Sequence, residues 1–215
     1  HFPLKKVVLA IIGIFTLPIL ISIPFFPQDP LFDLMNLFKN TAEGYKYTSL
    51  YAFNFWSIVG WWKPDIDLWF LTTYQIWGVF LYLISIFILL FSFIKSRLIN
   101  SSSVYLLIAL TIMIFFLFPT RVHERYLFPF FAFFLIFIMI RKSLFNFALW
   151  LILSIIHLAN LWYVYYYYNY VYNNTAISKP IIYTFIDDSY KALAFLTLAI
   201  FFLLIIKSFH EKYNS

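Results

Sequence analysis

The chain has 215 residues, of which 64% are hydrophobic and only 11% are charged, so it lacks the polar surface that a water-soluble globule needs. Its net charge of +6 is spread over short segments between apolar runs, which argues against nucleic acid as a partner. The absence of cysteine excludes disulfides and thiolate metal sites. We expect neither a metal nor a cofactor.

Six apolar stretches are candidates for membrane-spanning helices, because such a helix needs about 20 mostly apolar residues. They cover residues 7–26, 69–94, 104–118, 126–140, 144–165 and 190–206. The sequence therefore predicts an all-α integral membrane protein with about six transmembrane helices, in which Pro18, Pro24 and Pro129 lie inside spans and permit kinks. We expect residues 1–215 to form one membrane domain, the C-terminal part of a longer chain.

Alternate loops differ in charge, which predicts the orientation of the spans. One set of loops holds a single acid, Glu211, and eight bases: Lys5, Lys6, Lys95, Arg97, Arg141, Lys142, Lys207 and Lys212. The other set comprises the loops 27–68, 119–125 and 166–189, in which acids and bases nearly balance. Because bases are retained in the cytoplasm, we predict cytoplasmic termini and three extracytoplasmic loops, in a plasma membrane if the protein is bacterial.

The long first loop contains two stretches that mix apolar and polar residues, 31–38 and 49–62. This pattern is typical of helices that lie in the headgroup plane of a membrane. The loop and the start of the next span also carry Trp56, Trp61, Trp62 and Trp69, which fit an aromatic belt at the interface. We therefore predict interfacial helices in residues 27–68.

The densest polar cluster is the turn 119–126, which reads Pro-Thr-Arg-Val-His-Glu-Arg-Tyr between two apolar runs. If a helix starts near Pro119, Arg121 and Arg125 fall on one face, and Glu124 can orient one guanidinium. Paired guanidiniums beside a helix N-terminus suit a phosphate, to which His123 can add a hydrogen bond or a proton. The alternative is that these side chains contact lipid headgroups and form an internal salt bridge.

Further candidates are Asn54 and Trp56, which offer a hydrogen bond and a stacking surface to a sugar or an acceptor. The sequence favours the other interpretation for both residues, which is structural packing of an interfacial helix. Asp65 and Asp67 follow Pro64, which favours a turn or a helix cap. His157 lies in an apolar span, which favours a buried histidine whose hydrogen bonds are satisfied.

Two segments resemble motifs of the polytopic membrane glycosyltransferases with the C-type fold, in particular the bacterial mannosyl- and glucosyltransferases related to the protein O-mannosyltransferases. The string PTRVHERYLFP resembles the late extracytoplasmic motif of these enzymes. The string YTSLYAFNFWSIVGWWKPD resembles a segment that they carry some sixty residues earlier, usually Asn-Ala-Phe-Asn-Leu-Trp ahead of a glycine. The order of the two motifs matches, and the similarity covers most of the chain.

The resemblance implies an enzyme that transfers a sugar from a polyprenyl-phosphate donor to an acceptor on the outer face of the membrane, with inversion and without a metal. Arg121, His123 and Arg125 would hold the lipid phosphate, with Glu124 and Tyr126 supporting them. The family's catalytic base lies in an N-terminal module upstream of the segment that this chain resembles. The catalytic base of this enzyme is thus unassigned, and the N-terminal part of the same enzyme is an expected partner.

The second motif departs from the family, because Leu50-Tyr51-Ala52-Phe53-Asn54 places only Asn54 on a family asparagine. Two other classes of function stay open. In one, the chain is a segment of a transporter or flippase, and the basic turn gates an anionic lipid or solute. In the other, the chain is a non-catalytic membrane subunit.

Overall fold

The computed structural model describes residues 4–96, 101–173 and 178–210. Contacts within the chain define two compact units, residues 1–45 and residues 46–215, where the sequence predicted one membrane domain.

The first unit consists of two helices, α1 (Leu4–Ser22) and α2 (Pro30–Gly44). Pro18 lies inside α1 as predicted, whereas Pro24 follows the end of that helix. Asp29 caps α2 by accepting a hydrogen bond from the Phe32 backbone N–H at 3.0 Å. The helix predicted over 31–38 is therefore present and continues to Gly44, while its location at a membrane surface stays a prediction.

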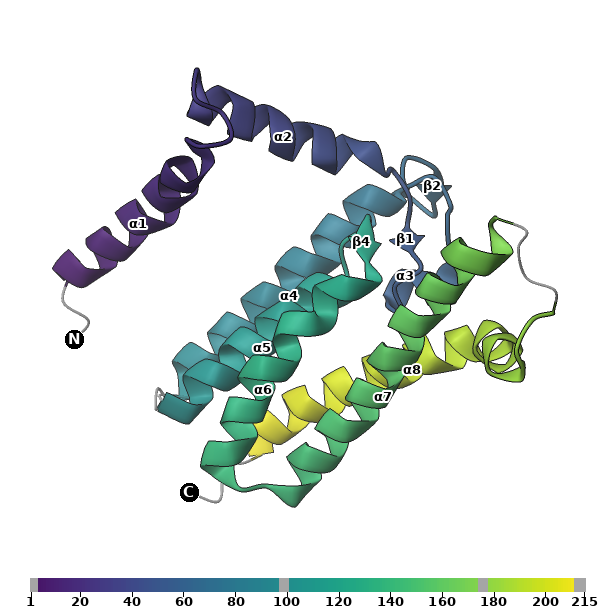
Figure 1. Ribbon diagram of the computed structural model, residues 1–215. Coiled ribbons are helices and arrows are strands. Elements are labelled where there is room, and N and C mark those ends of the chain that lie inside the picture. The colour runs from purple at the N-terminus through teal and green to yellow at the C-terminus, as the bar shows by residue number, and fades with distance from the viewer. Residues whose placement is uncertain (1–3, 97–100, 174–177, 211–215) are drawn as a thin grey trace. The chain divides into compact units, whose positions relative to one another are not determined.

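The second unit is built on five long helices: α4 (Tyr74–Ser96), α5 (Ser101–Leu117), α6 (Phe128–Arg141), α7 (Leu144–Tyr166) and α8 (Ile181–His210). Each overlaps one predicted span. α5 and α6 form an antiparallel hairpin, with α4 packed on α5 and with α7 packed on α6 and α8 (Figure 1). Residues that meet inside this bundle, such as Leu110, Phe130 and Phe134, have no exposed side-chain surface.

Among the described residues, three helical segments are long and apolar enough to cross a membrane: Tyr74–Lys95 in α4, Leu144–Val171 in α7 and the helical turn that continues it, and Ile181–Lys207 in α8. These helices support the prediction of a helical membrane protein. Ser102–Leu117 in α5 and Ile12–Ser22 in α1 are apolar but shorter, and α6 has 14 residues. The count of about six spans therefore stays a prediction.

The boundaries of two spans differ from the prediction. α7 continues into a turn of π-helix, η2 (Tyr167–Val171), and α8 begins at Ile181 rather than near residue 190. The loop predicted over 166–189 is thus largely helical. The acid Asp187 lies inside α8, where its carboxylate accepts a hydrogen bond from the Tyr163 hydroxyl of α7 at 2.6 Å. Pro129 was also predicted to permit a kink inside a span. It lies instead in the first turn of α6, where proline causes no kink.

The predicted interfacial helix over 49–62 is wrong except at its centre, where α3 covers Phe55–Val59. Ser49–Leu50 forms a short strand, β1, which pairs in parallel with β4 (Val122–His123). Tyr51 takes a positive φ of 61°, which interrupts any helix there. Residues 48–54 are buried in protein, so backbone pairing and packing prevail over the helical pattern. A second pair of strands, β2 (Leu68–Trp69) and β3 (Thr72–Thr73), forms a hairpin that leads into α4.

Candidate functional site

The basic turn between α5 and α6 is not the start of a helix. Arg121 takes a positive φ of 65°, Val122 and His123 form β4, and a 3-10 turn, η1 (Glu124–Leu127), precedes α6. The prediction that Arg121 and Arg125 share one helical face is therefore wrong. The reason is a tertiary interaction: the Arg121 backbone N–H donates to the Tyr47 carbonyl at 2.9 Å, and β4 pairs with β1.

The Arg121 guanidinium is bound by a buried carboxylate. Its Nε and Nη2 donate to the two oxygens of Asp65 at 2.6 and 3.2 Å, and the Thr120 hydroxyl donates to Asp65 at 3.0 Å. The Asp65 side chain is fully buried. Asp65 lies in a turn, as predicted, and its carboxylate is in addition the ion-pair partner of Arg121. The charge of Arg121 is compensated within the protein, and its side chain holds the turn against the loop that contains Asp65.

Arg125 is held differently, because its side chain is 59% exposed. Its Nη1 lies 3.5 Å from a Glu124 carboxylate oxygen, and its guanidinium lies 5.7 Å from the centre of the Tyr126 ring. The other Glu124 oxygen lies 3.8 Å from His123 Nδ1. The predicted placement of Glu124 beside one guanidinium is thus confirmed, with His123 on its other side.

Glu124 is mostly buried, and burial by itself raises the pKa of its carboxyl. The hydrogen bond from His123, a backbone hydrogen bond and the positive charge of Arg125 outweigh burial and lower the pKa below its usual value. Glu124 is therefore a carboxylate at neutral pH, placed to orient both neighbouring bases.

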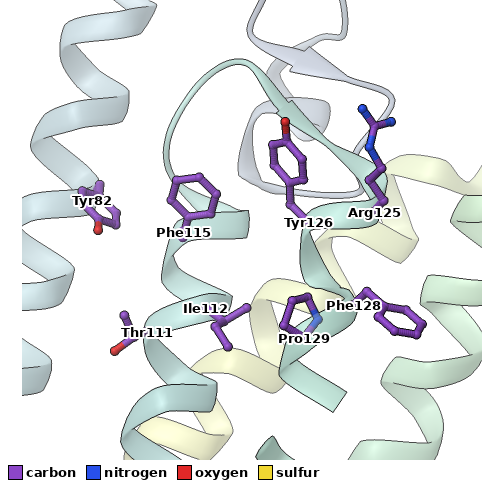
Figure 2. A pocket seen from close by; sticks show the side chains of 8 residues that line it. All are labelled: Tyr82, Thr111, Ile112, Phe115, Arg125, Tyr126, Phe128 and Pro129. Atoms are coloured by element: carbon purple, nitrogen blue, oxygen red, sulfur yellow. The ribbon is translucent and has the colours of Figure 1, made fainter. Parts of the chain in front are cut away.

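An apolar groove of about 770 Å³ lies beside Arg125. Its lining comes from α4, α5, η1 and the start of α6, and comprises Tyr82, Thr111, Ile112, Phe115, Arg125, Tyr126, Phe128 and Pro129. Figure 2 shows the Arg125 guanidinium and the Tyr126 hydroxyl extending to the same end of this groove. The arrangement combines an exposed positive charge with a long apolar surface, which fits an amphiphilic anion.

Asn54 and Trp56 have structural roles. The Asn54 side-chain oxygen caps α3 by accepting from the backbone N–H groups of Trp56 and Ser57, and its amide donates to the Phe116 carbonyl at 3.2 Å. The Trp56 indole donates to the Phe118 carbonyl at 2.5 Å. Neither side chain has exposed surface, so the packing interpretation holds, and the suggested sugar contact gains no support.

His157 is buried in α7, as predicted, but its predicted hydrogen bonds are missing. Its side chain packs against the ring of Phe131, with centroids 5.1 Å apart. Neither ring nitrogen has a hydrogen-bond partner within the part of the chain that the structure describes.

Two structural contributions were not evident from the sequence. One is the pairing of Asp65 with Arg121, and the other is Asn160 of α7, which accepts from the Phe53 N–H at 3.0 Å and donates to the Tyr51 carbonyl at 2.7 Å. Both join residues far apart in the chain, so no local pattern marks them. The signal available was the presence of polar residues in otherwise apolar surroundings.

Comparison with known proteins does not assign the chain to a family. No protein-family model, no characterised protein and no solved structure matches it.

Proposed function

We propose that this chain is the C-terminal, lipid-phosphate-binding part of an integral-membrane glycosyltransferase, and that Arg125 binds the phosphate of a polyprenyl-phosphate sugar. The observation that carries this proposal is the exposed Arg125 guanidinium at the end of the apolar groove. A hydrocarbon chain would lie against Phe115, Ile112 and Pro129, and its phosphate would meet Arg125. The motif resemblance supplies the class of reaction.

The structure changes the set of residues proposed to bind the phosphate. Arg125 is the principal ligand, because its guanidinium is the more exposed of the two and already borders the groove. His123 and the Tyr126 hydroxyl can add hydrogen bonds, and Glu124 orients Arg125 and His123. Arg121 holds the turn through Asp65 and is left out of the proposed ligand set.

In the proposed reaction, an acceptor oxygen forms a bond to the anomeric carbon of the sugar while the bond from that carbon to the phosphate oxygen breaks. The electron pair of the broken bond leaves with the lipid phosphate, and Arg125 stabilises the charge that develops there. The acceptor proton passes to a base that the resemblance places upstream of this chain. The chain by itself is therefore expected to bind the donor lipid without transferring sugar.

Binding of farnesyl phosphate to the purified full chain tests the proposal. We expect Arg125→Ala to weaken binding about 10- to 100-fold, because a hydrogen bond to a charged group contributes about 1.5–3 kcal/mol. Lys95→Ala removes an exposed base from the last turn of α4, away from both proposed lipid sites, and is the control, for which binding should be unchanged. Farnesol, which lacks the phosphate, should bind the wild type and Arg125→Ala equally.

Two results would count against the proposal. One is an Arg125→Ala variant that binds farnesyl phosphate as tightly as the wild type does. The other is a wild type that binds farnesol as tightly as farnesyl phosphate. In the complete enzyme, Arg125→Ala should abolish sugar transfer while the protein still inserts into the membrane.

A further inference from the structure

We propose a second lipid site, for an anionic phospholipid, between the beginning of α7 and the end of α8. A groove of about 320 Å³ lies there, lined by Phe145, Leu203, Ile206 and Lys207. This site does not rest on the proposed function. The two sites lie at opposite ends of α6, whose 14 residues span about 20 Å.

A fixed ammonium group provides the charge at this site. Lys207 Nζ donates to the Ser143 hydroxyl at 3.3 Å and to the Asn146 side-chain oxygen at 3.1 Å, and it lies 4.3 Å from the centre of the Phe145 ring. The Ser143 hydroxyl also caps α7 by accepting from the Asn146 backbone N–H. Asn146 is 2% exposed, so this helix start is rigidly packed. The fold therefore holds the Lys207 ammonium in one place, whereas the ammonium of an exposed lysine moves freely.

The apolar part of the groove argues for a lipid rather than a soluble anion. The side chains of Phe145, Leu203 and Ile206 are each about half exposed next to Lys207. An acyl chain can cover this surface while its headgroup meets the ammonium. A soluble phosphate would use only the charge and leave the apolar surface exposed.

The surrounding charge indicates a headgroup with net negative charge. Arg141 and Lys142 directly precede Ser143, both with exposed side chains, and the positive end of the α7 dipole lies beside them. Bases greatly outnumber acids in the loops at this end of the predicted spans. Anionic headgroups attract such basic clusters at a membrane surface.

Thermal unfolding of the purified full chain in neutral detergent tests this site. For each protein we take the difference between the Tm with added phosphatidylglycerol and the Tm with added phosphatidylcholine. A ligand that binds the folded state stabilises it, so specific binding of phosphatidylglycerol makes this difference positive. For the wild type we expect a positive difference. Lys207→Met should remove most of it and weaken phosphatidylglycerol binding about fivefold, the typical effect of one lysine near a membrane surface. Lys191→Met, in an exposed position on the same helix, should keep the difference.

Scoring the difference within each variant separates ligand binding from any loss of stability that the substitution itself causes. A second variant, Leu203→Trp, fills the groove and leaves Lys207 in place, and it should also reduce the difference. An unchanged difference in Lys207→Met would overturn the site. So would an equal response of the wild type to both lipids, or stabilisation by inorganic phosphate that matches the lipid. Farnesyl phosphate binding at Arg125 is measured separately, so either proposal can fail alone.

Discussion

Asp65 and Arg121 are 56 residues apart in the sequence and form a two-pronged ion pair, with N–O distances of 2.6 and 3.2 Å. The pair joins the loop before α4 to the turn between α5 and α6. Because Val122 and His123 follow directly in β4, this contact helps to fix the backbone that carries Glu124 and Arg125.

Removal of one partner of this ion pair should strongly destabilise the protein. We expect Asp65→Asn to lower the free energy of unfolding by about 3–5 kcal/mol, because it leaves a guanidinium without its buried counter-charge. Asp67→Asn, two residues later at an exposed position, should change it by less than about 0.5 kcal/mol. Denaturant unfolding in detergent measures the stability of both variants. If Asp65→Asn were as stable as Asp67→Asn, the ion pair would contribute nothing to stability.

Replacement of both partners tests whether Arg121 binds the lipid phosphate. The double variant Asp65→Leu/Arg121→Met should recover much of the lost stability, because an apolar pair of similar volume often replaces a buried ion pair. We expect it to keep farnesyl phosphate binding within about threefold of the wild type, since Arg125 is retained. A folded double variant that no longer binds would make Arg121 a ligand after all.

Glu124 should make stability depend on pH in the acid range. Its pKa is lowered in the folded protein, so its contribution is fully present above the usual carboxyl pKa and is lost as pH falls through the lowered value. We expect Glu124→Gln to have a lower Tm than the wild type at pH 7 and the difference to shrink below about pH 4. A difference that stays constant over this range would exclude a role for the Glu124 charge.

Gly78 should not tolerate a larger side chain. A Cβ added there would lie 3.0 Å from the Thr120 backbone nitrogen and 3.1 Å from the Phe118 carbonyl oxygen. These are backbone atoms of the segment that leads from α5 into the basic turn, so they cannot move aside cheaply. We expect Gly78→Val to lower Tm and to weaken farnesyl phosphate binding. Gly13→Val in α1 is the control, because among the described residues no atom outside its own stretch of helix lies within 4 Å of a Cβ added at Gly13.

The predicted orientation can be tested with single cysteines, because the chain contains none. In intact bacterial cells, a membrane-impermeant maleimide should label Asn173→Cys, which lies on the predicted outer side, and leave Lys142→Cys unlabelled until the cells are opened. Both positions are exposed in the structure, so accessibility within the protein does not bias the comparison. The reverse labelling pattern would invert the predicted orientation and place Arg125 on the cytoplasmic side.

Composition and hydropathy by themselves determined where the long helices lie, because a lipid solvent demands apolar runs whose backbone bonds are satisfied locally. Each predicted span overlaps a helix, and the pairing of Glu124 with a neighbouring base also followed from local spacing. Helix ends were less well predicted. The turn that carries Arg121 was misassigned because its backbone bonds reach Tyr47 and β1 rather than its own helix.

Only the tertiary structure decided which polar residues bind one another and which remain exposed for a ligand. Arg121 and Arg125 look equivalent in the sequence, yet one is neutralised by Asp65 and the other borders an apolar groove. For Asn54 and Trp56 the sequence favoured packing over a sugar contact, and in the structure the carbonyls of Phe116 and Phe118 accept their side-chain hydrogen bonds. The physical reason is that a buried donor or charge must find a partner. In this fold those partners come from segments tens of residues away.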